Sequence, residues 1–157
     1  MAMRAPENEP AEPVAAVEPD LAGEIEFLTV RAAASGTRLA RARLRPLGLN
    51  VRSYSVLALA GSGDGWSQRA IAAYLDLDPS QVVSLVDELE AKGLLTREVD
   101  AADRRARRVR ATPAGTDLLV HARQAAAEAE DEALAALAPE ERAVLLRLLR
   151  RIVFAED

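Results

Sequence analysis

Arginine is concentrated in one short segment of the second half of the chain. Between residues 97 and 110 there are six arginines against three acidic residues. The planar guanidinium group binds phosphate oxygens through paired hydrogen bonds and is attracted into a narrow minor groove of DNA. The segment is therefore a candidate contact with a nucleic-acid backbone, with an aspartate orienting the arginines at its tip. Its expected binding residues are Arg97, Asp103, Arg104, Arg105 and Arg107.

A helix expected over residues 79–92 precedes the arginine segment. Asp78 is a suitable N-cap, Pro79 suits the first helical position, and Gly93 suits the position after the last turn. Helical periodicity places three apolar side chains on its buried face. They are Val82, Val86 and Leu89. The opposite surface, near the N-terminus of this helix, is left small and polar.

This polar surface could read the edges of DNA bases. It consists of Ser80, Gln81, Val83 and Ser84. The major groove admits one α-helix, hydroxyl and amide groups can form hydrogen bonds there, and a valine can contact a thymine methyl group. The amides and dipole of a helix N-terminus also favour phosphates. We therefore expect these four residues to contact bases.

The neighbouring elements are expected to position both groups of residues. A helix over residues 68–75, capped by Ser67, is joined by a tight turn to the helix at 79–92. Two strands between residues 94 and 112 then enclose the arginine-rich turn as a hairpin. This order is that of a winged helix-turn-helix, whose second helix enters the major groove. Ser67 and Arg69, at the start of the first of these helices, are further expected DNA contacts.

The rest of the chain is expected to be helical after a polar beginning. Residues 1–19 combine four prolines with four glutamates and predict a disordered, acidic, Pro/Ala-rich tail. Longer helices are expected from Asp20 to Arg45, from Pro113 to about residue 136, and from Pro139 onward, with a short helix after Asn50. The fold class is thus mainly α with a small β-hairpin.

Composition restricts the possible functions. The net charge of −5 argues at first sight against a nucleic-acid partner, but the arginine stripe can form a local basic surface on an acidic protein. The absence of cysteine excludes disulfides and thiolate metal sites, and it fits a reducing cytoplasm. The single histidine, His121, cannot assemble a zinc centre or a catalytic triad. We expect no cofactor and no membrane association.

The ordered segments resemble the MarR (multiple antibiotic resistance regulator) family of winged helix-turn-helix transcriptional regulators. The likeness rests on residues 67–72, 82–97 and 103–115, which match the helix-turn-helix and wing of that family in order, and it extends over about residues 20–155. The resemblance assigns the family's wing aspartate and arginine to Asp103 and Arg105.

The same resemblance implies a homodimer that binds a pseudo-palindromic DNA operator. Helix 1 within residues 20–46 and the C-terminal helices within residues 113–157 would form the dimer, and residues 47–112 would form the DNA-binding domain. The two half-sites would then lie about one helical turn apart. Many relatives are repressors released by small aromatic or phenolic effectors.

Two features depart from the family pattern. Ala101 stands where a proline is common and Ala111 where a larger aliphatic residue is usual, which predicts a looser wing. The DNA-reading helix has no basic residue before Lys92 and carries Asp87, Glu88 and Glu90. Tight binding would therefore depend on the wing arginines, Arg69 and backbone contacts.

The sequence thus predicts a cytoplasmic, sequence-specific transcriptional regulator, a repressor released by a small effector. The alternative is a winged helix that docks another protein through the acidic tail and binds DNA only weakly and without selectivity. An enzyme would need a clustered nucleophile and base, or a metal set, and the sequence offers neither. Effector-binding residues are expected beside helices 1 and 2 and the wing, at Leu28, Arg31, Tyr54 and Trp66.

Overall fold

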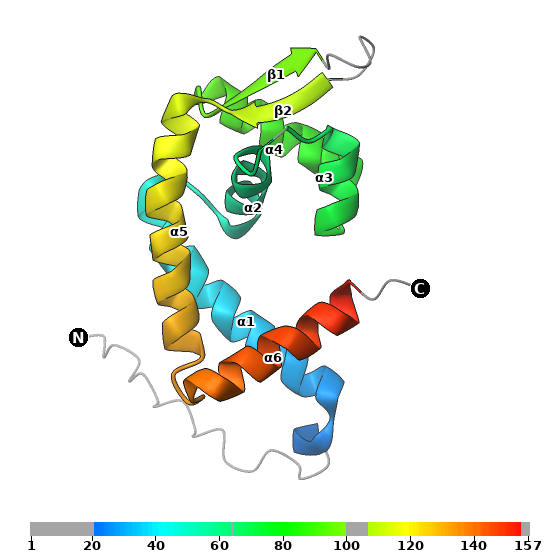
Figure 1. Ribbon diagram of the computed structural model, residues 1–157, viewed down its shortest axis with the longest axis vertical. Coiled ribbons are helices and arrows are strands. Elements are labelled where there is room, and N and C mark those ends of the chain that lie inside the picture. Colours follow the sequence, from blue (N-terminus) through cyan, green and yellow to red (C-terminus); the bar gives the residue numbers. More distant parts are fainter. Residues whose placement is uncertain (1–20, 64, 100–106, 155–157) are drawn as a thin grey trace, which may run out of the picture. The chain divides into compact units, whose positions relative to one another are not determined.

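The computed structural model describes residues 21–63, 65–99 and 107–154 of the chain (Figure 1). Within these ranges the protein is mainly helical with one two-stranded antiparallel sheet, which confirms the expected fold class. The chain divides into two units, residues 1–34 and 35–157. The elements are α1 (Ile25–Leu44), α2 (Val51–Ala60), α3 (Gln68–Leu75), α4 (Pro79–Ala91), β1 (Leu95–Val99), β2 (Arg107–Ala111), α5 (Pro113–Ala133) and α6 (Pro139–Val153). Short 3-10 turns cover Leu21–Gly23 and Arg45–Leu47.

Side-chain caps begin several helices where the sequence predicts them. The Asn50 side chain accepts a hydrogen bond from the Ser53 amide at 2.9 Å, and the Ser53 hydroxyl accepts one from the Asn50 amide at 2.9 Å. Ser67 accepts a hydrogen bond from a first-turn amide of α3 at 3.1 Å, and Thr112 accepts one from a first-turn amide of α5 at 3.0 Å. Such a cap contributes about 1 kcal/mol of stability. The helix starts are therefore set by local sequence.

Two helix ends differ from the expectation. α1 begins at Ile25 and not at Asp20, because a 3-10 turn over Leu21–Gly23 precedes it. α5 ends at Ala133 and not near residue 136. Beyond it the Leu137 amide bonds to the carbonyl three residues earlier at 2.9 Å, which tightens the chain into a turn before the proline that starts α6.

The turn between α3 and α4 is tight and buries the sides of the two helices that face each other. Asp76 adopts a left-handed conformation with φ of 50°, which ends α3, and the Leu77 amide bonds back to the Ala72 carbonyl at 3.0 Å. Behind the turn, the fully buried side chains of the lobe come from α2, α3, α4 and β2. The largest are Leu57, Ile71, Leu89, Val56, Val82, Val86 and Val109. The apolar stripe predicted for the 79–92 helix is thus confirmed.

The hairpin is supported by a third segment that the sequence did not predict. β1 and β2 pair in a register that sets Arg97 opposite Val109. Trp66 forms a β-bridge to Val109, with backbone hydrogen bonds of 2.8 and 3.2 Å between the two residues. The segment that connects α2 to α3 therefore also fixes the inner edge of the wing.

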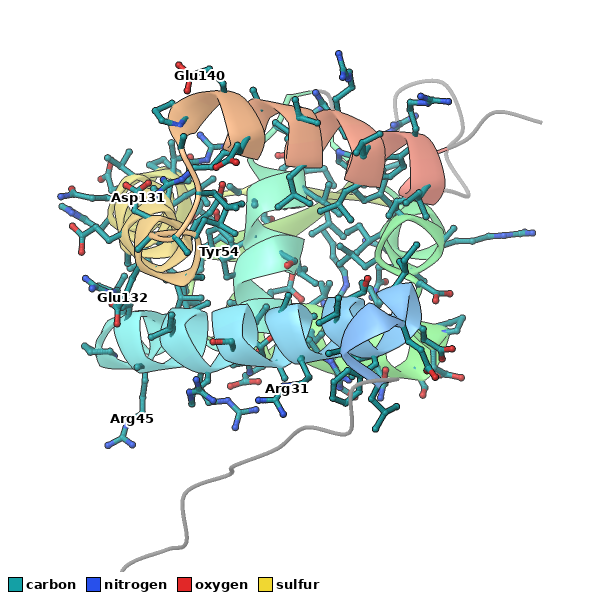
Figure 2. The ribbon with its side chains drawn as sticks, turned by 90° about the horizontal axis from the view of Figure 1, so that it is seen from below. Arg31, Arg45, Tyr54, Asp131, Glu132 and Glu140 are labelled. Carbon is teal, nitrogen blue, oxygen red and sulfur yellow. The ribbon has the colours of Figure 1, made fainter. Side chains whose placement is uncertain are left out.

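Helix α5 leads from the hairpin toward α6 and is held on two sides by ion pairs (Figure 1). Arg43 of α1 binds Glu128 at 2.6 Å and Glu132 at 2.8 Å, and Arg142 of α6 binds Asp131 at 2.7 Å. Figure 2 shows Asp131 and Glu132 on opposite sides of α5, the first toward α6 and the second toward α1. Within residues 35–157, α5 therefore connects the other long helices to the winged lobe.

Close approach of the backbone requires a glycine at the start of α5. A Cβ atom at Gly115 would lie 2.0 Å from the Leu94 carbonyl oxygen. The Thr112 amide donates to this same oxygen at 3.0 Å. The first turn of α5 is thus packed directly against the backbone that enters β1, which anchors α5 to the wing.

Candidate nucleic-acid interface

The four residues expected to read bases lie together on one exposed surface of α4. Three of them, Ser80, Gln81 and Ser84, are exposed polar side chains, and Val83 is 44% exposed. Their positions follow from the buried stripe of α4, which turns them away from the core. The structure therefore presents a small, mixed polar and apolar surface at the N-terminal end of this helix.

Asp78 caps this end of α4 and binds Ser80 twice. Its carboxylate accepts the Ser80 amide at 2.7 Å and also the Ser80 hydroxyl. These two hydrogen bonds, with a further one from the Gln81 amide, hold the pKa of Asp78 below its usual value. Because the hydroxyl proton of Ser80 is donated to Asp78, that oxygen is left to act as a hydrogen-bond acceptor.

The acidic residues of α4 are each paired with a cation. Arg97 of β1 binds Asp87 through one guanidinium nitrogen and Glu90 through the other. Lys92 binds Glu88 at 3.0 Å and also donates to the Gly48 carbonyl at 3.3 Å. Local pairing thus compensates the negative charge that the sequence places on this helix.

Arg97 therefore binds carboxylates within the protein, and its guanidinium group is not left open for a phosphate. Only 18% of its side chain is exposed, and both terminal nitrogens bind carboxylates of α4. The contact joins β1 of the wing to the C-terminal half of α4, the helix expected to read bases. Sequence reasoning missed these partners because Asp87 and Glu90 were considered only as charges unfavourable to DNA.

Two other arginines of the stripe hold the wing onto the loop before α3. Arg108 donates to the Gly65 carbonyl at 3.0 Å, and Arg110 donates to the Gly63 carbonyl at 2.9 Å. Arg110 also binds Glu98 across the hairpin at 3.1 Å. The sequence predicted a basic outer face here, but three of the four described arginines of the stripe, Arg97, Arg108 and Arg110, make internal contacts.

The remaining wing residues divide between described and undescribed parts of the chain. Arg107 is exposed at the end of β2 and makes no ion pair among the residues that the structure describes. Asp103, Arg104 and Arg105 lie outside the described residues. Ahead of the wing, Arg69 is exposed on the first turn of α3, where Ser67 is the half-buried cap.

The four expected effector residues fall in both units. Leu28 is 48% exposed, and the Arg31 guanidinium lies 5.7 Å from the centre of the Phe27 ring, all within residues 1–34. Tyr54 and Trp66 are half-buried in the second unit. The Trp66 indole nitrogen donates to the Ser62 hydroxyl at 3.0 Å.

The lobe formed by α2, α3, α4 and the hairpin defines a winged helix-turn-helix protein. A family model described as MarR family matches residues 47–106. The chain is 33% identical over 137 residues to a transcriptional regulatory protein for the hcr operon of Thauera aromatica. The aligned region covers 87% of this chain and 82% of that protein. The chain belongs to the MarR family of DNA-binding transcriptional regulators, as the resemblance implied.

Solved structures agree with this assignment. CouR from Rhodococcus jostii RHA1, in a crystal structure with bound p-coumaroyl-CoA, is 37% identical, with a TM-score of 0.81 and coverage of 87% of this chain and 96% of CouR. A MarR family regulator from Rhodococcus sp. RHA1 is 36% identical, with a TM-score of 0.78 and coverage of 84% and 95%. No helix among the described residues is long and apolar enough to cross a membrane.

Proposed function

We propose that this regulator binds a pseudo-palindromic operator as a homodimer and represses transcription until a small aromatic effector releases it. The observation that carries the proposal is the exposed surface at the N-terminal end of α4, on a helix whose acidic residues are paired with Arg97 and Lys92. A helix that is polar at its tip and locally neutralised along its length can enter the major groove without strong repulsion from phosphates.

The side chains of α4 suggest separate roles. Ser80, as an acceptor, suits an amino group of adenine or cytosine, and Gln81 can donate and accept at one adenine edge. Ser84 bonds to the Ser80 carbonyl at 3.1 Å, so its hydroxyl is oriented along the helix and its lone pairs stay available. Val83 supplies an apolar contact for a thymine methyl group.

Phosphate contacts would come from the edges of the lobe. Arg69 and Arg107 are exposed on α3 and β2, on either side of α4 along the chain, and the Ser67 hydroxyl can donate while its oxygen caps α3. Arg104 and Arg105, with Asp103 orienting them, are proposed as the contacts of the wing tip. Arg97 is proposed to position the wing and not to bind phosphate.

An exposed apolar surface on α6 supports the homodimer. Most of its large hydrophobic side chains remain exposed, with Ile152 at 72% and Val153 at 66%. Val144, Leu148 and Ile152 recur at intervals of four residues and so share one face of the helix. A contiguous apolar face of this kind is stabilised when a second copy covers it.

The effector proposal draws on the relative with a bound ligand. CouR binds p-coumaroyl-CoA in its crystal structure, and it shares 37% of aligned residues with this chain. We therefore propose an aromatic acyl compound as the effector class. The regulator would act in the cytoplasm by binding and not by catalysis, which agrees with the regulatory function of its family.

Selection of bound duplexes from a random pool, followed by titration at several salt concentrations, tests the proposal. We expect an inverted repeat with half-sites about one helical turn apart and a steep dependence of affinity on salt. Weak, salt-sensitive binding without enrichment of any sequence would contradict it and favour a winged helix that docks another protein.

A further inference from the structure

Helix α5 connects the winged lobe to α6 as a long arm. Its 21 residues span about 31 Å at the usual rise of an α-helix. The half of α5 next to the wing belongs to the lobe, because Leu119 and Ala122 are buried in its core and Gly115 packs against the Leu94 carbonyl. The other half leads to α6 (Figure 1). A change in the angle between α5 and α6 therefore moves the whole lobe relative to α6.

Two side chains of α6 form the hydrogen bonds of the corner between these helices. The Glu141 carboxylate accepts a hydrogen bond from the Ala138 amide at 2.8 Å and closes the first turn of α6. The Arg142 guanidinium donates to the Asp131 carboxylate at 2.7 Å and to the Leu137 carbonyl at 3.2 Å. Its second terminal nitrogen lies 3.5 Å from the Asp131 carbonyl oxygen. Arg142 thus binds both the last turn of α5 and the connection that follows it.

The position of Arg142 is explained by α5 and not by α6. It is the fourth residue of α6, where the helix dipole favours acidic side chains. The last carbonyls of α5 carry partial negative charge, and an arginine can bind such carbonyls. The connection itself, residues 134–138, consists only of leucine and alanine, whose side chains form no hydrogen bonds. The angle of the corner therefore depends on Arg142 more than on the connection.

A single pair of rings attaches the other end of α6 to the lobe. Phe154, which follows α6, stacks on Tyr74 of α3 with centroids 5.5 Å apart and an interplanar angle of 29°. Stacked rings tolerate lateral offsets, whereas a guanidinium group has fixed directions for its hydrogen bonds. Of the two attachments, Arg142 restricts the angle of α6 more closely.

A small rotation at the corner is enough to matter on the scale of DNA. Rotation by about 10° at one end of an arm of about 31 Å displaces the other end by about 5 Å. One added base pair moves a half-site by about 3.4 Å and turns it by about 35°. A dimer that distinguishes operators differing by one base pair in spacing therefore needs a fixed corner.

We propose that Arg142 is a positioning residue that determines which spacing of operator half-sites the dimer accepts. It holds α6, whose apolar face is proposed for the homodimer, at a fixed angle to α5, which carries the winged lobe. The separation of the two α4 helices in the dimer follows from this angle. The inference rests on the proposed function, since it requires a dimer and an inverted repeat.

Titration of the full-length protein against the selected operator, and against versions with one central base pair added or removed, tests this role. We expect the wild type to bind the selected spacing at least about tenfold more tightly than the other two. Arg142→Gln should lower this ratio to about threefold or less, because a freed corner lets the dimer adjust to each spacing. Arg142→Lys keeps the charge beside Asp131 but loses the guanidinium fork, so it should give an intermediate ratio.

Arg147→Gln is the matched control. It removes the same charge from an exposed position of the same helix, and no hydrogen bond or ion pair of its side chain occurs among the described residues. It should keep the wild-type ratio. Loss of the Arg142 contacts should leave the fold intact as well, because the ion pair with Asp131 is largely exposed and such pairs contribute little to stability.

Two further measurements separate this role from a structural one. Binding to a duplex with a single half-site should be equal in the wild type and R142Q, and sedimentation should give the same oligomeric state. Weaker binding to the half-site, or a changed oligomeric state, would overturn the inference, because Arg142 would then support the lobe or the dimer itself.

Failure of the inference and failure of the proposed function give different results. An unchanged ratio in R142Q, or a wild type that binds all three spacings alike, would overturn the role of Arg142 and leave the regulator intact. Absence of sequence-specific DNA binding in the wild type would instead overturn the proposed function.

Discussion

Arg97 of β1 and Asp87 of α4 form an ion pair that joins the wing to the recognition helix. Glu90, almost one turn further along α4, binds the other nitrogen of the same guanidinium. Since a recognition helix and a wing reach different parts of a duplex, a fixed contact between them restricts how the lobe can approach DNA. Arg97 thereby sets geometry and, at the same time, compensates two carboxylates near the expected phosphates.

Replacing Arg97 by Gln should weaken operator binding about tenfold. The substitution removes the ion pairs that hold the wing against α4, and it leaves the carboxylates of Asp87 and Glu90 without their partner. The triple variant R97Q/D87N/E90Q removes all three charges and should recover part of this loss. Titration of the selected operator at one salt concentration measures both effects. Equal affinities of the single and triple variants would show that the carboxylates do not matter.

The salt dependence distinguishes positioning from phosphate binding. Each phosphate contact contributes about 0.9 to the slope of log affinity against log salt. Arg107→Gln, at an exposed residue of β2, should lower the magnitude of this slope by about that amount. R97Q/D87N/E90Q should leave it unchanged. A smaller slope in R97Q/D87N/E90Q, with the wild-type slope in Arg107→Gln, would show that Arg97 binds phosphate and Arg107 does not.

Gln81→Ala and Ser84→Ala should alter which bases are preferred at particular operator positions. Each good pair of hydrogen bonds to a base edge discriminates by about 1–3 kcal/mol, and the variants lose that discrimination at one position only. Competition titrations against a panel of single-base operator variants measure the change. Arg69→Gln is the control, since a lost phosphate contact should weaken all duplexes alike; a uniform loss in the α4 variants would exclude a base-reading role.

Acid should weaken the cap of α4. The pKa of Asp78 is lowered in the folded protein because its carboxylate accepts the Ser80 hydroxyl and the amides of Ser80 and Gln81. A lowered pKa means that the stabilisation is complete above the usual value of 3.8 and is lost as pH falls through the folded value. Asp78→Asn keeps a cap without the titration, so its melting temperature should fall less than that of the wild type in this acid range. Parallel melting curves at every pH would contradict this.

Gly115→Ala should destabilise the protein by about 3 kcal/mol, because the added methyl group meets the Leu94 carbonyl oxygen. Gly36→Ala in α1 is the control. A Cβ atom at Gly36 meets nothing within 4 Å, and alanine favours the helix by about 0.5–1 kcal/mol. Urea unfolding measures both free energies. A tolerated Gly115→Ala would mean that the start of α5 can move away from β1 at little cost.

Local chemistry accounts for what could be predicted from the sequence. The caps Asn50, Ser67 and Thr112 act within three residues, and the buried stripe of α4 follows from helical periodicity alone. For the same reason the sequence alone locates the exposed surface at Ser80 and its neighbours.

Contacts between distant segments account for what was missed. The carboxylate partners of Arg97 depend on how the hairpin packs against α4, and the partners of Arg108 and Arg110 are carbonyls of the loop near Gly65. Neither set has a signature in the order of residues. The stacked rings of Tyr74 and Phe154 belong to residues 80 positions apart, so helical periodicity in the sequence cannot predict their contact.

Protection of guanine N7 atoms from methylation, on the duplex selected from the random pool, tests the central claim most directly. N7 lies in the major groove, where the N-terminal end of α4 is proposed to read bases. We predict two protected clusters related by two-fold symmetry and separated by about one helical turn. A single cluster, or strong binding with every N7 left reactive, would contradict a dimer that reads the major groove through α4.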